Sequence, residues 1–313
     1  MSDIIDRVLE ATDGFARVPA PVYSGRVLRY DGLIAECAGF QASPGTLCQV
    51  ETEDGTHVTG EIVGFANGRN ILFLNQPGAR ITAESAVHQL SGGHSVSVGD
   101  DLLGRVVDAD GAPLDGCPPP ACPDDRPLAG RMFNPLARQA VDTPLDVGVR
   151  LINAALTVGR GQRVGIIAGS GVGKSVLIEM MTRYTEADVV VVGLIGERAR
   201  EVGDFVKTVM NGDNHGKTCV VAVPADRSPI LRMRAAHRAT AIAEYFRDQG
   251  KQAMLIMDSL TRVAHARREI GLALGEHPTA KGYPPSVISM SAAWTRTPPG
   301  ACRRTPGSST PSA

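Results

Sequence analysis

A glycine-rich stretch at residues 168–175, with the sequence AGSGVGKS, contains the residue types that bind a polyphosphate. Glycines let successive backbone N–H groups point inward at the phosphates, and the positive end of a following helix favours the same negative charge. In loops of this spacing the lysine, here Lys174, reaches the β- and γ-phosphates, and the hydroxyl of Ser175 binds Mg²⁺. Glycine is common at the first position, and Ala168 is small enough to be tolerated there. The predicted nucleotide-binding residues are Gly169, Ser170, Gly171, Val172, Gly173, Lys174, Ser175 and Val176.

Two acidic residues follow apolar strands that the sequence predicts further along the chain. Residues 253–258 end in Asp258, and residues 189–195 lead into Glu197. Carboxyl ends of parallel strands meet at one edge of a sheet, beside the phosphate loop. Asp258 is expected to hold Mg²⁺ there with the serine of the loop, and Glu197 to orient and polarise an attacking water as a general base. Glu201 is the rival base, but it lies further from the strand end, in the next predicted helix. The predicted catalytic residues are Lys174, Glu197 and Arg198, and the predicted metal ligands are Ser175 and Asp258.

Composition narrows the class of protein. A chain of 313 residues with 43% apolar content can bury a large core, and its length predicts about two domains. The net charge of -1 gives no basic field for nucleic acid, so no nucleic-acid partner is expected. Acids near the start, and the lack of an apolar run of membrane-spanning length, predict a cytoplasmic protein. The six cysteines lack metal-site spacing and are expected to be reduced thiols.

Changes in composition along the chain predict four segments. Residues 1–21 contain a short amphipathic helix that is expected to form on a partner. Residues 22–92 alternate short apolar segments with glycine-containing turns, which predicts a small antiparallel β-barrel domain. Residues 93–290 are expected to form an α/β domain that begins with an irregular stretch rich in Gly, Pro and Asp. Residues 291–313 are rich in Pro, Ser, Thr and Arg without apolar periodicity, so we expect a disordered tail.

The α/β domain is expected to contain a parallel sheet. Continuous apolar strands, separated by helical stretches such as residues 235–246, are typical of a sheet covered by helices on both faces. The first of these strands leads directly into the phosphate loop, and the loop leads into a helix, as the motif requires. The predicted strands are residues 164–168, 189–195, 219–223, 253–258 and 287–290.

Several of these segments together carry a family resemblance. Four of them resemble the hexameric ATPases related to the catalytic subunit of rotary ATP synthases: residues 169–175, 193–198, 226–229 and 258–262. Four more are similar to the type III protein-export ATPases of the bacterial flagellum and the virulence injectisome: residues 146–150, 156–163, 268–273 and 281–287. The match runs from about residue 22 to 290, is most specific in the central domain, and favours the flagellar branch.

The resemblance implies a RecA-like phosphate-loop ATPase domain preceded by the β-barrel, and hydrolysis of ATP with Mg²⁺ to drive type III protein export. It also implies a homohexameric ring in the cytoplasm, peripherally associated with the export gate of the inner membrane. The implied partners are export substrates, their chaperones, and a regulator that binds the N-terminal helix. In such rings the site lies between subunits, and a neighbour's arginine stabilises charge on the γ-phosphoryl group.

The end of the chain departs from that family pattern. After Met290 the family continues with further core strands, an arginine-bearing region and a helical domain, whereas residues 291–313 look like out-of-frame translation. A natural low-complexity tail is the alternative interpretation. A chain truncated in this way is expected to bind ATP poorly and to hydrolyse it negligibly.

Three classes of function stay open from the sequence. The first is an export ATPase, flagellar or of the injectisome. The second is a rotary ATP synthase-type subunit or an RNA-translocating hexameric helicase, although a helicase needs a basic, aromatic-bearing groove for which the barrel has few residues. The third is a catalytically inert nucleotide-binding protein.

Overall fold

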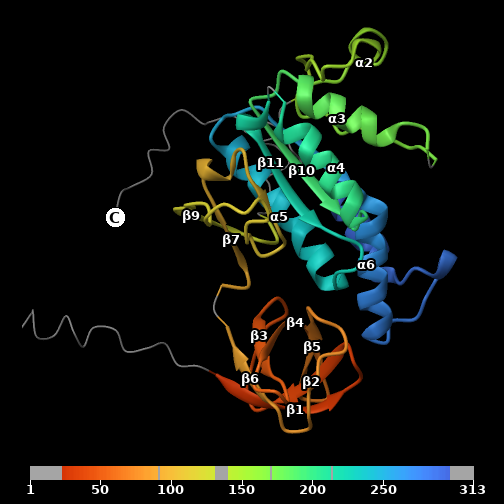
Figure 1. Cartoon of the computed structure of the whole chain (residues 1–313). Coiled ribbons are helices and arrows are strands. Elements are labelled where there is room, and N and C mark those ends of the chain that lie inside the picture. Colours follow the sequence, from red (N-terminus) through yellow and green to blue (C-terminus); the bar gives the residue numbers. More distant parts are fainter. Residues whose placement is uncertain (1–22, 91, 131–139, 170, 213, 297–313) are drawn as a thin grey trace, which may run out of the picture.

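The computed structural model describes residues 23–90, 92–130, 140–169, 171–212 and 214–296. Within them the chain forms a β-barrel, at the bottom of Figure 1, and an α/β body above it. The amphipathic helix expected within residues 1–21 lies outside the described residues, as does most of the predicted tail. Among the described helices, none has both the length and the apolar character needed to cross a membrane.

The β-barrel is closed by six antiparallel strands in the order β1-β2-β5-β4-β3-β6. Closure pairs both edges of every strand, which removes the exposed edge of an open sheet. The β4–β5 hairpin turns at Asn67 and Gly68, whose φ values of 51° and 73° explain why an Asn-Gly pair is found there. The predicted antiparallel barrel is therefore confirmed. Its strands are β1 (Ser24–Tyr30), β2 (Ile34–Ala38), β3 (Leu47–Glu51), β4 (His57–Ala66), β5 (Arg69–Leu74) and β6 (Ala86–Gln89).

A parallel sheet forms the centre of the α/β body, with its strands in the order β12-β10-β11-β8. All residues of β10 are buried, because helices cover both faces of the sheet. Two of the strands have the predicted bounds, and a third begins one residue earlier than predicted. The strands are β8 (Val106–Val107), β10 (Val189–Ile195), β11 (Thr218–Val223) and β12 (Ala253–Asp258).

Helices pack on the two faces of the sheet in pairs. One face, with Val191 and Ile195 of β10, packs against α5 and α6; the other, with Val192, packs against α3 and α4. Figure 1 shows α5 running along the sheet from its upper end down to the barrel. This arrangement is the α/β fold that the sequence predicted. The helices are α3 (Lys174–Tyr184), α4 (Ala199–Met210), α5 (Pro229–Asp248) and α6 (Leu260–Ala273).

The connection between barrel and sheet is more regular than the sequence predicted. β7 (Ser95–Val98) and β9 (Asp124–Pro127) form an antiparallel pair, while β8 joins the parallel sheet beside β11. Isolated Val-Val and Ser-Val pairs among glycines and prolines give too short a pattern to be recognised as strands. The remaining short helices are η1 (Asp100–Leu102), α2 (Arg150–Ala155), η3 (His215–Lys217) and η4 (Ala280–Gly282).

The segment before the phosphate loop is not the buried strand that the sequence predicted. Residues 164–168 pair with no strand of the described residues, and all of them are exposed, Ile167 to 99%. Apolar residues form a strand only where a neighbouring strand supplies hydrogen-bond partners. The outer edge of β12 also lacks a partner within the described part of the chain.

The last predicted strand, residues 287–290, is also wrong, because these residues belong to helix α7 (Pro285–Arg296). A short apolar run fits a strand or a helix equally well, and proline at the first helical position favours the helix. α7 packs against α6 and buries Val287. The helix includes residues 291–296, so the predicted disorder is wrong for them, while residues 297–313 lie outside the described chain.

A buried arginine of α5 joins the α/β body to the barrel. The Arg234 guanidinium, 5% exposed, donates to Asp110 Oδ1 at 2.8 Å, to the Gly93 carbonyl at 2.9 Å and to Glu61 Oε2 of β4 at 3.3 Å. Burial raises the pKa of Glu61 to about 7, and the attraction of Arg234 offsets only part of that effect. Hence the proton on Glu61 is bound more tightly in the folded than in the unfolded protein.

Replacing Glu61 by glutamine is expected to change how stability depends on pH. Because the pKa is raised from 4.5 to about 7, the unfolding free energy of the wild type should fall as pH rises through this window. The unfolding free energy of E61Q should fall less over that window than that of the wild type, by on the order of 2 kcal/mol. Chemical denaturation at each pH measures the difference. The matched control is E84Q, at a barrel carboxylate that is 63% exposed. Equal pH slopes in E61Q and the wild type would contradict the assignment.

Candidate active site

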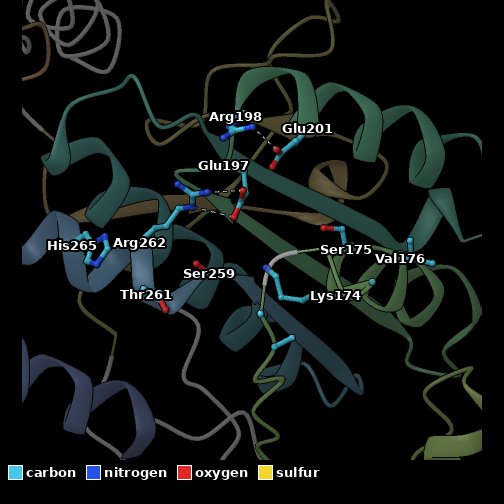
Figure 2. Close-up of a pocket in the computed structure, with 14 residues that line it drawn as sticks. Lys174, Ser175, Val176, Glu197, Arg198, Glu201, Ser259, Thr261, Arg262 and His265 are labelled. Carbon is cyan, nitrogen blue, oxygen red and sulfur yellow. Dashed lines mark hydrogen bonds and ion pairs between the residues drawn. The ribbon is translucent and has the colours of Figure 1, made fainter.

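A pocket of about 710 Å³ opens where the phosphate loop faces the carboxyl ends of β10 and β12. Its volume lies within the range of small-molecule sites. Figure 2 shows side chains from the first turn of α3, from the end of β10 and from the start of α6 around this space. The lining residues are Ala168, Gly169, Gly171, Gly173, Lys174, Ser175, Val176, Glu197, Arg198, Glu201, Ser259, Thr261, Arg262 and His265.

The phosphate loop turns through two glycines in the left-handed region. Gly171 has a φ of 77° and Gly173 a φ of 92°, conformations that residues with a Cβ rarely adopt. Gly173 is followed directly by α3 and supplies no side-chain cap to it. The N–H groups of the first turn of α3 therefore remain available for an anion.

Lys174 and Asp258 connect the loop to the sheet. Lys174 Nζ forms an ion pair with Asp258 Oδ1, and the carboxylate is buried. Asp258 is held there by parallel pairing of β12 with β10, in which it lies opposite Leu194. Ser175, the next residue of α3, lines the pocket beside this pair. The structure thus brings a cation and a hydroxyl that are neighbours in the sequence to a carboxylate that lies 84 residues away from Lys174.

Glu197 follows β10 at the opposite side of the pocket, and Arg262 of α6 holds its carboxylate. Arg262 Nε donates to Oε1 at 3.1 Å and Arg262 Nη2 to Oε2 at 3.0 Å. The Glu197 side chain is 14% exposed and that of Arg262 38%. Backbone hydrogen bonds from Gly196 N to the Val223 carbonyl and from Ala225 N to the Glu197 carbonyl fix the strand end. The predicted base therefore points into the pocket as one half of a bidentate ion pair (Figure 2).

Arg198 and Glu201 lie on the rim of the same pocket. They pair with each other at 3.8 Å, and their side chains are 80% and 54% exposed. Glu201, the alternative base, is in α4 as expected, one turn further from the strand end than Glu197. Its position at the rim and its pairing with Arg198 make Glu197 the better-placed carboxylate.

Sequence reasoning missed four residues that line the pocket: Ser259, Thr261, Arg262 and His265. The signal was present for Arg262, because a cation one turn into a helix that follows a strand ending in Asp258 must lie near the sheet edge. Among the predicted residues, Val172 is exposed without lining the pocket, and Ser170 lies outside the described residues. No cluster of three His, Cys, Asp or Glu side chains suited to a metal occurs within the described chain.

Comparisons with known proteins agree with this geometry. Residues 148–296 match the family model described as the ATP synthase alpha/beta family, nucleotide-binding domain. The chain is 49% identical over 304 residues to the flagellum-specific ATP synthase of Salmonella typhimurium, covering 92% of this chain and 66% of that protein. It is 44% identical over 268 residues to the type 3 secretion system ATPase of Xanthomonas euvesicatoria, covering 85% of this chain and 60% of that protein. The chain thus spans less than two thirds of these relatives.

A solved structure shows the same architecture. The assembled ATPase EscN from the type III secretion system of enteropathogenic E. coli superposes with a TM-score of 0.81 at 37% identity. The match covers 89% of this chain and 67% of that one. Both the barrel and the α/β body therefore belong to one shared fold.

Gly196 is predicted to be the least replaceable glycine at the site. Its φ is 72°, and a Cβ there would lie 2.8 Å from Arg262 Cδ, so alanine would be strained and would displace Arg262. We expect Gly196→Ala to lower the unfolding free energy by about 1–3 kcal/mol in chemical denaturation. The matched control is Gly203→Ala in α4, where a Cβ meets nothing within 4 Å, and which should stabilise by about 0.5–1 kcal/mol. Similar effects of both substitutions would contradict this account.

Proposed function

Because the chain belongs to the family of flagellum-specific ATP synthases and type III secretion ATPases, we propose that it binds ATP and hydrolyses it to drive protein export. The observation that supports this function most strongly is one pocket lined by the phosphate loop and by Glu197. A loop alone would support nucleotide binding. A carboxylate on the opposite side of the pocket adds the group that hydrolysis needs.

Each residue of the site has a distinct proposed task. The N–H groups of the loop and of the first turn of α3 bind the phosphate chain, and Lys174 exchanges Asp258 for the β- and γ-phosphates. Glu197 accepts a hydrogen bond from a water molecule and takes its proton as the new O–P bond forms. The bond from the γ-phosphorus to the bridging oxygen breaks at the same time, which leaves ADP and phosphate. Arg198, at the rim, is proposed to stabilise charge on the transferred group.

Magnesium is the metal that fits the donors present. Ser175 offers a hydroxyl and Asp258 a buried carboxylate, both hard oxygen ligands. Two protein ligands are enough, because Mg²⁺ in such sites is shared with the phosphates and water. When bound, the ion would neutralise phosphate charge, and Lys174 would then no longer be the sole cation opposite Asp258.

The assembly and its partners are proposed from family membership. The solved relatives are described as an assembled ATPase and as that ATPase with its central stalk EscO. We propose a homohexameric ring that works on export substrates and their chaperones, on the cytoplasmic side of the inner membrane beneath the export gate. A regulator is proposed to bind residues 1–21. Flagellar export is favoured over injectisome export, since identity to the Salmonella flagellar protein is 49% and to the Xanthomonas secretion ATPase 44%.

Two substitutions are expected to separate binding from hydrolysis. Lys174→Ala removes the cation that meets the phosphates and should weaken MgATP binding at least about 10-fold. Glu197→Gln should bind MgATP at least as tightly as the wild type and lose turnover by on the order of 10²-fold or more. Binding is measured with a fluorescent ATP analogue and turnover by phosphate release.

The control is Glu186→Gln, at an exposed carboxylate beyond the end of α3 that does not line the pocket. It should leave both quantities at wild-type values. Where the wild type turns ATP over, equal turnover in Glu197→Gln rejects the assigned base. Wild-type binding without turnover favours the inert nucleotide-binding alternative, and absence of binding rejects the proposed function.

A further inference from the structure

The geometry points to Arg262 as a positioning residue that restrains the proposed base until a triphosphate binds. In the structure its guanidinium holds Glu197; when a terminal phosphate enters the pocket, the guanidinium exchanges Glu197 for that phosphate and leaves the carboxylate free for water. This inference rests on the proposed ATP hydrolysis. Arg262 then has two roles. It lines the pocket as a cation, and it controls when Glu197 is available as the base.

The ion pair engages both carboxylate oxygens of Glu197. Both carboxylate oxygens accept from the same fork, at 3.1 and 3.0 Å. Bidentate pairs of this kind are directional and stronger than single hydrogen bonds. A carboxylate whose oxygens both accept from a cation has less negative charge to offer a water molecule. Parting from Arg262 therefore frees the oxygens of Glu197 to accept hydrogen bonds from a water molecule.

Arg262 is the more accessible partner and the one that can move. Its side chain is 38% exposed and lines the pocket, whereas that of Glu197 is 14% exposed and is fixed at the end of β10. Four rotatable side-chain bonds allow the guanidinium to swing while its Cα stays in place. An anion entering the pocket therefore meets Arg262 before it meets the restrained base.

The backbone of Arg262 is held in place by the packing of its helix, so only its side chain needs to move to release Glu197. α6 packs against α5, where Glu269 accepts a hydrogen bond from Arg232 at 2.8 Å. The alkyl stem of Arg262 crosses Gly196 so closely that a Cβ there would lie 2.8 Å from Cδ and 3.1 Å from Cβ of the arginine. Gly196 thus creates the room in which Arg262 reaches Glu197. The restraint is built from the strand end and the helix together.

A second ion pair of the site also joins a cation to a carboxylate, through a single contact between Lys174 Nζ and Asp258 Oδ1. Lys174 faces Asp258 as Arg262 faces Glu197, so the two cations are each neutralised by a carboxylate before a nucleotide arrives. Lys174 meets both the β- and γ-phosphates, but only a triphosphate brings a group as far as the base. ADP is therefore expected to open the first pair and leave the second intact. Glu197 is released only when there is a bond to hydrolyse.

Binding of two nucleotides to the wild type and to variants of Glu197 and Arg262 tests this switch without relying on turnover. The probes are Mg²⁺ with ADP and Mg²⁺ with the non-hydrolysable ATP analogue that has NH in place of the β–γ bridging oxygen. Glu197→Gln weakens the ion pair with Arg262, so it should tighten binding of the triphosphate analogue by about 3- to 10-fold. The affinity for ADP should stay within about 2-fold of the wild-type value. Arg262→Gln should weaken binding of the triphosphate analogue by about 10-fold and change ADP affinity little.

The double variant supplies the decisive comparison, because the tightening depends on Arg262. In the Arg262→Gln background, Glu197→Gln should no longer tighten binding of the triphosphate analogue. Arg262→Lys, which keeps the charge but lacks the fork, should recover part of the triphosphate affinity and show a smaller coupling to Glu197. Glu186→Gln serves as the control and should match the wild type.

The outcomes separate this inference from the function beneath it. If the wild type binds neither nucleotide, the proposed function fails. If it binds both, the switch is overturned when Glu197→Gln changes ADP and triphosphate affinity equally, when it changes neither, or when its effect persists without Arg262.

Discussion

The parallel pairing of β10 with β12 is the constraint on which the site depends. It places Asp258 opposite Leu194, so the residues after Leu194, including Gly196 and Glu197, leave the sheet beside that carboxylate. A shift of the register by one residue would turn the side chains of β12 to the opposite face and move Asp258 away from Lys174. The burial of every residue of β10 opposes such a shift, since each face packs against its own pair of helices. The hydrophobic core thus sets the position of two charged groups.

Buried arginines connect the parts of the chain around that sheet. Arg234 binds the barrel, the connection and the α/β body, and Arg232 joins α5 to α6. Such pairs add little net stability, because removing the charges from water costs about as much as their attraction returns. These pairs contribute mainly through their directionality. A planar guanidinium donates hydrogen bonds to acceptors in fixed positions, and this favours one arrangement of the neighbouring elements. The barrel is therefore coupled to the helix that supports α6, and α6 carries Arg262.

Sequence alone predicted the parts of the fold with strong local patterns. The bounds of β10 and β12, the barrel and the residues of the phosphate loop follow from periodicity and from spacing of glycines. Arg262 was out of reach as a partner of Glu197, because 65 residues separate them and no local pattern encodes that contact. The prediction of a strand at residues 287–290 was wrong for a different reason, because so short an apolar run is compatible with a strand or with a helix, here α7. The strand predicted at residues 164–168 was wrong because strand formation depends on a neighbouring strand as well as on composition.

Because residues 164–168 are exposed and do not form the predicted strand, the sheet does not position the phosphate loop through the segment that precedes it. With no strand of the described chain beside that segment, the loop is held from its other end, by α3, where Ile178 packs against the sheet. The ion pair of Lys174 with Asp258 then provides the direct link between the loop and the sheet edge. A nucleotide that draws Lys174 to its phosphates breaks that link and must replace it through its own contacts with both sides. The cation that is proposed to bind phosphate is thus also the one that holds the loop to the sheet edge in the structure.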